Sequence, residues 1–251
     1  GHDLMASAQT GTGKTAAFVL PSLHRLSTPS TKNSRGPRVL VLTPTRELAN
    51  QVTAAAIKYG KHMRFRIGSV VGGMPYPPQM RLLSQPLDIL VATPGRLLDH
   101  MERGRIDYSR LEVLVLDEAD RMLDMGFIHA VEKIAAATPA ARQTLLFSAT
   151  LEGTIAKLAK RLLKNPKLIQ INTVQERNEQ IEQRLHHVDD GAHKQRLLTH
   201  LLNDGDMDKA IVFTATKRGA DRLAKTLHAK GHPATALHGD MNQNQRNRAI
   251  T

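Results

Sequence analysis

Residues 8–15 read Ala8-Gln9-Thr10-Gly11-Thr12-Gly13-Lys14-Thr15, and this stretch decides the fold. The two glycines let backbone N–H groups turn inward around an anion, Lys14 adds a positive charge, and the Thr15 hydroxyl can bind a magnesium ion. Mostly apolar residues (4–8) precede the stretch, and helix-forming residues (16–20) follow it. A bound phosphate would therefore lie at a helix N-terminus, where the helix dipole favours negative charge. The pattern predicts a strand, a phosphate-binding loop and a helix.

One position departs from the common form of this loop. The motif usually begins with glycine, whereas Ala8 stands at that place here. The alternative interpretation is a Gly/Thr-rich turn before an amphipathic helix. The remainder of the chain decides between the two interpretations.

Short aliphatic runs alternate with helical stretches along the chain, which predicts an α/β fold of parallel sheets flanked by helices. Most of the runs are continuous rather than alternating, as expected of strands buried on both faces. The expected strands are residues 38–43, 67–71, 89–93, 113–117 and 144–148, and later 184–188, 210–214 and 234–238. Ligands of such sheets bind beyond the carboxyl ends of the strands. Most of these ends carry small, charged or hydroxyl-bearing residues.

Two polar segments indicate how the chain is divided. Residues 27–37 are rich in Ser, Thr, Pro, Gly and Lys and predict an exposed loop. A second polar segment begins near residue 172, so we expect a first domain at 1–172, a linker at 173–183 and part of a second domain at 184–251. In the second domain we expect helices over 194–202 and 218–230 and another from about 242. Three strands and an unfinished helix make a poor independent domain, so we expect this one to be truncated.

Composition narrows the range of partners. The net charge is +12, most of it before residue 174, which favours a polyanionic partner. Only 3% of residues are aromatic and none is tryptophan, so a nucleic acid would be held by its backbone rather than by its bases. The absence of cysteine excludes disulfides and thiolate metal sites and fits the cytoplasm. No apolar run is long enough to span a membrane, so we expect no membrane partner.

Two adjacent carboxylates, Asp117 and Glu118, end the buried run 113–116. In a phosphate-loop protein, an acid at the end of a neighbouring strand anchors the magnesium ion. Glu118 can then reach the water that attacks the terminal phosphate of a nucleotide. The alternative interpretation is a solvated helix start, because Asp and Glu favour first turns.

Two threonines, Thr45 and Thr93, precede expected helices, and an arginine follows each of them closely. Capped helix ends with Arg46 and Arg96 beside them could hold the phosphates of a polynucleotide. Each alone is equally well explained as an ordinary helix cap. The Gly72-Gly73 pair, which allows another backbone to approach closely, makes a continuous track more plausible.

The ordered set of motifs resembles the DEAD-box RNA helicases, in a bacterial form. The first half carries AQTGTGKT at 8–15, PTRELA at 44–49, GG at 72–73, TPGR at 93–96, DEAD at 117–120 and SAT at 148–150. The second half adds IVFTATK at 211–217 and HGDM at 238–241, followed by Gln243 and Arg246. Alanine at position 8 is normal in that family, so the departure noted above disappears.

The resemblance implies two RecA-like domains that close on ATP and single-stranded RNA. Residues 8–15 would bind ATP, Thr15 and Asp117 would hold Mg²⁺, and Lys14, Asp117 and Glu118 would be catalytic. Ser148, Thr150 and Asp120 would couple hydrolysis to strand separation. The RNA backbone would contact Pro44, Thr45, Arg46, Gly72, Gly73, Thr93, Pro94, Gly95, Arg96, Thr216, Gln243 and Arg246.

Two family elements would lie outside this chain. The adenine-recognising glutamine would precede Gly1, and the arginines that stabilise the transferred phosphate would follow Thr251. Because such an arginine contributes roughly 10³ to 10⁵ in turnover, we expect the chain to bind nucleotide weakly and hydrolyse it slowly. We also expect a monomer. The alternatives are a DNA helicase on the same fold and a nucleotide-dependent RNA clamp that does not separate strands.

Overall fold

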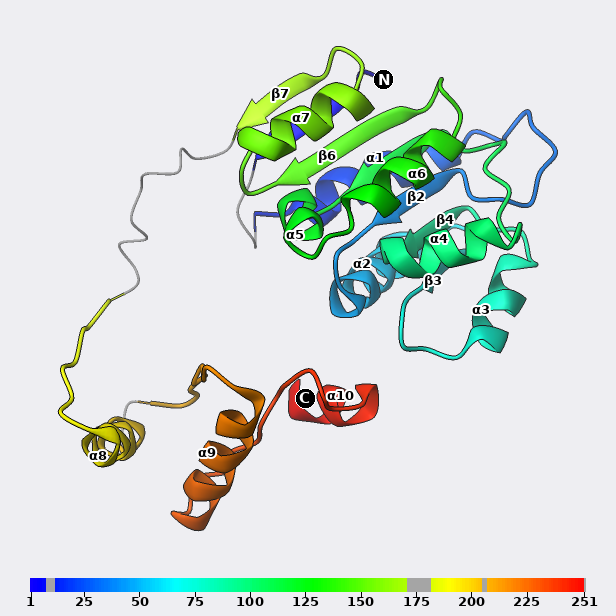
Figure 1. Cartoon of the computed structure of the whole chain (residues 1–251). Helices are drawn as coiled ribbons and strands as arrows, with labels where there is room; N and C mark the ends of the chain where they lie inside the picture. Colours follow the sequence, from blue (N-terminus) through cyan, green and yellow to red (C-terminus); the bar gives the residue numbers. More distant parts are fainter. Residues whose placement is uncertain (8–11, 171–181, 205–206, 251) are drawn as a thin grey trace. The chain divides into compact units, whose positions relative to one another are not determined.

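The aliphatic runs of the first part of the chain form a parallel sheet in the computed structural model (Figure 1). The structure describes residues 1–7, 12–170, 182–204 and 207–250. The chain divides into two units, Gly1–Arg177 and Asn178–Thr251. The strands of the first unit are β1 (Leu4–Ser7), β2 (Val39–Leu42), β3 (Ile67–Val70), β4 (Ile89–Ala92), β5 (Val113–Leu116), β6 (Gln143–Ser148) and β7 (Lys167–Gln170).

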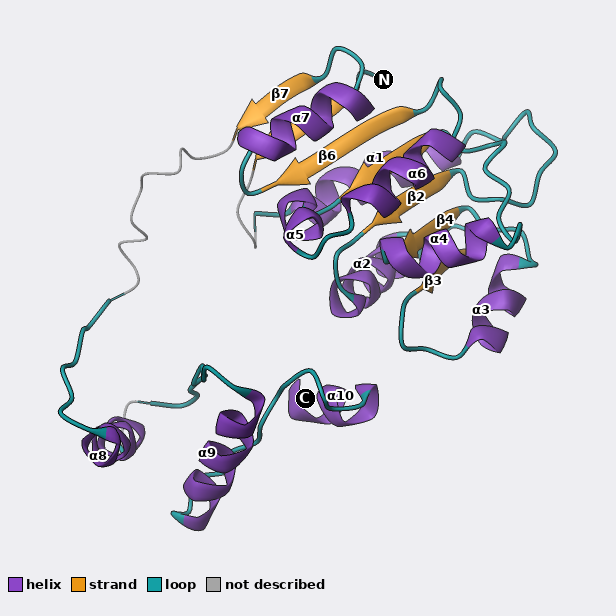
Figure 2. Ribbon diagram, viewed as in Figure 1, coloured by secondary structure: helices purple, strands orange, loops and turns teal. Residues whose placement is uncertain are grey.

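Helices cover both faces of this sheet (Figure 2). They are α1 (Lys14–Leu26), α2 (Arg46–Tyr59), α3 (Tyr76–Leu83), α4 (Pro94–Glu102), α5 (Ala119–Asp124), α6 (Ile128–Ala137) and α7 (Gly153–Leu162). Buried side chains of α1 and α2 pack in one core cluster, and those of α4 to α7 pack in the other.

Successive residues of a strand belong to different clusters. Leu40 and Leu42 of β2 pack with α4 to α7, whereas Val39 and Val41 pack with α1 and α2. A strand that is buried on both faces needs apolar residues at every position, which explains the continuous aliphatic runs. Each fully buried side chain of this kind stabilises the fold by about 1.5–3 kcal/mol relative to an exposed one.

The strand order decides which loops become neighbours. Within the described residues the order is β3-β4-β2-β5-β6-β1-β7, and each neighbouring pair is parallel. The loops that follow β1, β5 and β6 therefore leave one edge of the sheet side by side. The loops that follow β2, β4 and β3 leave the same edge as a second, adjacent group.

The first five expected strands are confirmed, each to within one or two residues at its ends. The three strands expected in the second unit are wrong: residues 184–188, 210–214 and 234–238 are not strands. Ile211 and Phe213 of the middle run are 84% and 93% exposed. A strand requires hydrogen bonds to a neighbouring strand, and no strand pair occurs among the described residues of this unit.

Helices of the second unit do form where the sequence predicts them. They are α8 (Gly191–Leu202), α9 (Lys217–Ala229) and α10 (Gln243–Ile250). Their hydrogen bonds are local, and side chains support the starts: Asp190 caps α8 and Thr216 caps α9. No helix in the described part of the chain is both long enough and apolar enough to cross a membrane.

Candidate functional site

The start of α1 forms the described part of the phosphate loop. Residues 8–11 of the predicted loop lie outside the described residues, so Ala8, Gln9, Thr10 and Gly11 remain predictions. Gly13 occupies the N-cap position of α1 with φ 85°, in the left-handed region that favours glycine. The first turn of α1 contains no acidic residue. The positive end of the helix dipole and a lysine therefore lie at the edge where β1 ends, which suits an anion.

Asp117 follows β5. In the sheet, β6 lies between β5 and β1. Its backbone N–H donates to the Leu42 carbonyl at 3.0 Å, and the residue is only 3% exposed. Burial raises the pKa of this carboxyl group to about 6, although the nearby charge of Lys14 acts in the opposite direction. The charges of Lys14 and Asp117 therefore interact in the structure, while the roles predicted for these residues stay predictions.

The Oδ1 atom of Asp117 is buried and has no hydrogen-bond partner in the described structure. A buried carboxylate oxygen without a partner is costly, and a hydrated cation would satisfy it. The Asp117 carboxylate therefore fits a magnesium ion that it would hold through water. Within the described residues no group of three or more His, Asp or Glu side chains could hold a metal ion. A hydrated ion on one carboxylate and a nucleotide needs no such group.

Glu118 adopts a backbone conformation that is unusual for a residue with a side chain. Its φ and ψ are both 54°, in the left-handed region, and it occupies the N-cap position of α5. Such a conformation costs about 1–3 kcal/mol and persists only where the surroundings impose it. Arg121 lies 3.4 Å from the Glu118 carboxylate. The strained residue connects Asp117, at the end of β5, to the start of α5.

The loop after β6 is bonded to both neighbouring motifs. The Ala149 N–H donates to Asp120 at 3.2 Å, and the Ser7 hydroxyl donates to the Ala149 carbonyl at 3.1 Å. Ser148 is fully buried and its hydroxyl accepts from the Thr150 N–H at 3.3 Å. The structure thus brings together Asp120, Ser148 and Thr150, and joins them to the end of β1.

The second group of loops follows β2, β3 and β4. The Thr45 hydroxyl caps α2 by accepting from the Leu48 N–H at 3.2 Å, as predicted. Thr93 stands at the N-cap position of α4 but does not cap that helix. Its hydroxyl instead accepts from the Gly72 N–H at 3.2 Å, so the expected cap is a bond between two loops.

Position 73 favours glycine because of its backbone conformation, and the Arg46 guanidinium lies close to it. Gly73 has φ 68°, and an added Cβ would lie 2.0 Å from the Arg46 Nη1 atom. Gly72 is bonded to Thr93, and Arg96 donates to the Met74 carbonyl at 2.8 Å. The predicted RNA-contacting residues of the first unit therefore form one continuous group: Pro44, Thr45, Arg46, Gly72, Gly73, Thr93, Pro94, Gly95 and Arg96.

The remaining predicted contacts belong to the second unit. Thr216 caps α9 by accepting from the Gly219 N–H at 3.0 Å. Arg246 of α10 donates to the His238 carbonyl at 3.4 Å, and Lys217 lies 2.6 Å from Asp240. These bonds connect the stretch at 216–217 to the stretch at 238–246. Gln243 donates to Asn247 within α10.

Sequence reasoning missed two residues next to this group, Tyr76 and Gln79. Both belong to α3, which was not predicted because Pro77 and Pro78 follow the glycine pair closely. Proline suits a first helical turn, so this signal was available. Gln79 is 6% exposed, and its Nε2 atom is 3.2 Å from each of three loop carbonyls, those of Val71, Met74 and Pro75.

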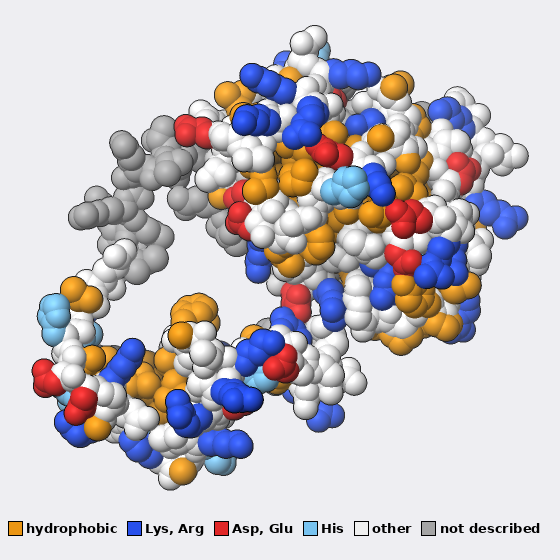
Figure 3. Space-filling model, in the orientation of Figure 1, with side chains coloured by type: hydrophobic (Ala, Val, Ile, Leu, Met, Phe, Trp, Pro, Cys, Tyr) orange, Lys and Arg blue, Asp and Glu red, His pale blue; other side chains and the backbone are white. Residues whose placement is uncertain are grey.

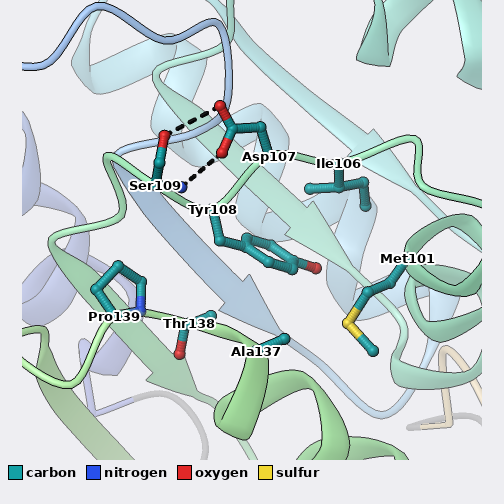
Figure 4. A pocket seen from close by; sticks show the side chains of 8 residues that line it. All are labelled: Met101, Ile106, Asp107, Tyr108, Ser109, Ala137, Thr138 and Pro139. Atoms are coloured by element: carbon teal, nitrogen blue, oxygen red, sulfur yellow. Dashed lines mark hydrogen bonds between the residues drawn. The ribbon is translucent and has the colours of Figure 1, made fainter.

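A pocket of about 390 Å³ lies at the opposite, amino-terminal edge of the sheet (Figure 4). It is lined by Met101, Ile106, Asp107, Tyr108, Ser109, Ala137, Thr138 and Pro139. The Asp107 carboxylate accepts two hydrogen bonds from Ser109. No residue of the predicted site lines this pocket.

Replacing Tyr108 by phenylalanine is expected to stabilise the protein by about 1 kcal/mol, because the buried Tyr108 hydroxyl has no partner in the described structure. The same burial raises the pKa of the phenol. A shift of about 2–4 °C in the thermal unfolding midpoint is expected. Tyr59→Phe, at a tyrosine that is 43% exposed, is the control and should leave the midpoint unchanged. A lower midpoint for Tyr108→Phe would contradict this account.

Comparisons with known proteins agree with this arrangement. Residues 1–158 match the DEAD/DEAH box helicase family, and residues 193–251 match the helicase conserved C-terminal domain. Two curated relatives from Escherichia coli (strain K12) are the ATP-dependent RNA helicases SrmB, 44% identical, and DeaD, 45% identical, each over 100% of this chain. The chain covers 56% of SrmB and 39% of DeaD, and so spans about half the length of these relatives or less.

One solved structure supports the fold directly. It is a DEAD box protein from the hyperthermophile Methanococcus jannaschii, 37% identical, with a TM-score of 0.63. The alignment covers 100% of this chain and 66% of that one. The predicted fold class, a RecA-like parallel sheet flanked by helices, is confirmed.

Proposed function

This chain belongs to the DEAD/DEAH box helicase family. We propose that it is part of an ATP-dependent RNA helicase, which binds single-stranded RNA and couples ATP hydrolysis to local duplex separation. The observation that carries the proposal is the strand order. It makes neighbours of the loops after β1, β5 and β6, where nucleotide chemistry is proposed, and places the loops after β2, β3 and β4 beside them.

In the nucleotide half of the site, residues 8–15 hold the triphosphate, with Lys14 as the point charge. Thr15 and Asp117 hold Mg²⁺, which neutralises charge on the phosphates when it is bound. Glu118 orients the attacking water and accepts its proton. Catalysis of this kind needs positioning and charge neutralisation more than covalent chemistry. The bonds from Asp120 and Ser7 to Ala149 support a coupling role for Ser148 and Thr150.

In the RNA half, the grouped segments 44–46, 72–73 and 93–96 contact the sugar-phosphate backbone, and Thr216, Gln243 and Arg246 of the second domain extend the track. Lys and Arg side chains are spread over the face seen in Figure 3, with Asp and Glu among them.

The organisation of the protein is part of the proposal. It comprises an ATP-binding domain at 1–172, a linker at 173–183 and part of a second RecA-like domain at 184–251. The two family matches, at 1–158 and 193–251, support this division. A cytoplasmic location is proposed on composition, which includes no cysteine. A monomer is proposed as well.

The test is ATP hydrolysis by this chain with single-stranded RNA, with single-stranded DNA of the same sequence, and with neither. We expect only slow hydrolysis by this chain, as stated from the sequence. Stimulation by RNA alone, abolished by Lys14→Ala, would establish the RNA helicase and overturn the expectation of slow hydrolysis, because contacts to the 2′-hydroxyl distinguish RNA from DNA. Equal stimulation by DNA would instead favour a DNA helicase. RNA binding that depends on ATP but never separates a short RNA duplex would favour an RNA clamp.

A further inference from the structure

Three arginine side chains surround the Tyr76 ring. Tyr76 itself has been given no role above. The Arg96 guanidinium carbon is 4.2 Å from the ring centroid, and the guanidinium carbons of Arg103 and Arg105 are at 5.6 and 6.0 Å. The His100 ring meets it edge-on, with centroids 5.5 Å apart. Arg96, His100 and Arg103 recur along α4 and just beyond its end, at the spacing of one helix face.

The ring is fixed from two directions. Its hydroxyl donates to the Asp99 carboxylate, which also accepts from Arg103 at 2.7 Å. Hydrogen bonds from Tyr76 and Arg103 lower the pKa of Asp99, so this carboxylate is ionised at neutral pH. On the other side, Gln79 holds the carbonyls of Val71, Met74 and Pro75, which fixes the chain that leads into Tyr76.

The charge balance around the ring is positive. Burial lowers the pKa of His100, which is therefore neutral at pH 7. Three arginines then face one carboxylate, Asp99. Of the three arginines, Arg96 lies in the first turn of α4, close to the Gly72–Thr93 bond.

Stacking on Tyr76 can strengthen binding by Arg96, because an arginine side chain is long and flexible. Immobilising its side chain on binding costs about 1.5–2 kcal/mol of rotamer entropy, and a side chain that is already held loses less. An arginine on an aromatic face keeps its N–H groups at the edge of the guanidinium plane. Of the five donors of Arg96, the bond to the Met74 carbonyl uses one.

We propose that Tyr76 is a positioning residue that holds the Arg96 guanidinium in the orientation in which it grips a phosphate of single-stranded RNA. Tyr76 acts through Arg96 and not by contact with the RNA bases. This inference rests on the proposed RNA-binding function.

The experiment compares Tyr76→Leu, Tyr76→Phe, Arg96→Ala and the double variant Tyr76→Leu/Arg96→Ala. RNA binding is measured by fluorescence anisotropy with an end-labelled single-stranded RNA at several salt concentrations. Tyr76→Leu should weaken RNA binding by roughly 2- to 30-fold, the range of a cation–π contact. The slope of log K against log salt is negative, and its magnitude should decrease by up to about 0.7. Tyr76→Phe keeps the aromatic face and should bind within about twofold of the parent.

The double variant provides the decisive comparison. If Tyr76 acts through Arg96, then Tyr76→Leu should have no further effect once Arg96 is alanine. ATP binding without RNA should be the same in all variants. The proposal is overturned if Tyr76→Leu binds like the parent, if Tyr76→Phe is as weak as Tyr76→Leu, or if the effect of Tyr76→Leu persists in the Arg96→Ala background.

A second readout needs no RNA and separates this inference from the proposed function. Ring-current shifts of the Arg96 side-chain protons, measured by NMR in the RNA-free protein, should be present in the parent and in Tyr76→Phe and absent in Tyr76→Leu. Absence of the shifts in the parent overturns the stacking itself, whatever RNA binding shows. If the shifts are present but the parent binds no RNA, the proposed function fails and the role of Tyr76 fails with it.

Discussion

Replacing Asp117 by asparagine is expected to stabilise the ligand-free protein while weakening its binding of ATP with magnesium. The folded-state pKa of Asp117, about 6, lies above the usual aspartate value of 3.8. The carboxylate therefore destabilises the fold above pH 6, and this penalty disappears as the pH falls through 6 towards 4. The difference corresponds to roughly 3 kcal/mol at pH 8, or about 6–12 °C in the unfolding midpoint.

The measurement is thermal unfolding of Asp117→Asn and the parent at pH 8 and pH 5 without ligand. The variant should be more stable at pH 8, and the gap should narrow at pH 5. Its affinity for ATP with magnesium should fall by about 10- to 100-fold, as for other residues that act on a metal through its outer shell. Asp124→Asn, at the exposed end of α5, is the control. An equal gap at both pH values would show that Asp117 carries no buried charge.

Replacing Glu118 by glutamine is expected to lower ATP turnover by about 10²- to 10⁴-fold with little effect on ATP affinity. Glutamine keeps the size of the side chain but cannot accept the proton of the attacking water. The backbone at Glu118 is already in the left-handed region, so the substitution should not alter the turn into α5. Single-turnover hydrolysis and equilibrium binding of ATP measure the two effects separately.

Glu152→Gln is the matched control for this prediction. Glu152 is exposed and stands before α7 without capping it by a side-chain bond. Its substitution should leave both turnover and affinity unchanged. Turnover by Glu118→Gln within threefold of the parent would assign the proton transfer to another group.

The sheet could be predicted because each strand is recognisable from its own short sequence. Runs such as Val113 to Leu116 are apolar at every position, as burial on both faces demands. Polar motifs directly after such runs must then lie at one edge of a parallel sheet. Which motifs become neighbours could not be predicted, because it depends on strand order. The pairing of β1 with β6 joins residues about 140 positions apart.

Other features depended on contacts that no local pattern encodes. Thr93 has the residue type and position of a helix cap, yet its hydroxyl serves Gly72 of a different loop. The run at 210–214 has strand composition but no pairing partner among the described residues, so its side chains stay exposed. Helix α9, whose hydrogen bonds are internal, was predicted to within a residue at each end. The roles assigned to individual site residues stay predictions until variants are measured.

Equilibrium binding of a fluorescent ATP analogue to this chain, with magnesium and with EDTA, tests the central claim most directly. We expect magnesium-dependent binding that Lys14→Ala weakens by roughly 10- to 100-fold, the effect of losing a charged hydrogen bond to phosphate. Lys157→Ala, at an exposed lysine of α7, should bind like the parent. Binding that is unchanged by Lys14→Ala, or that does not need magnesium, would contradict the assignment of the nucleotide site to the loop after β1.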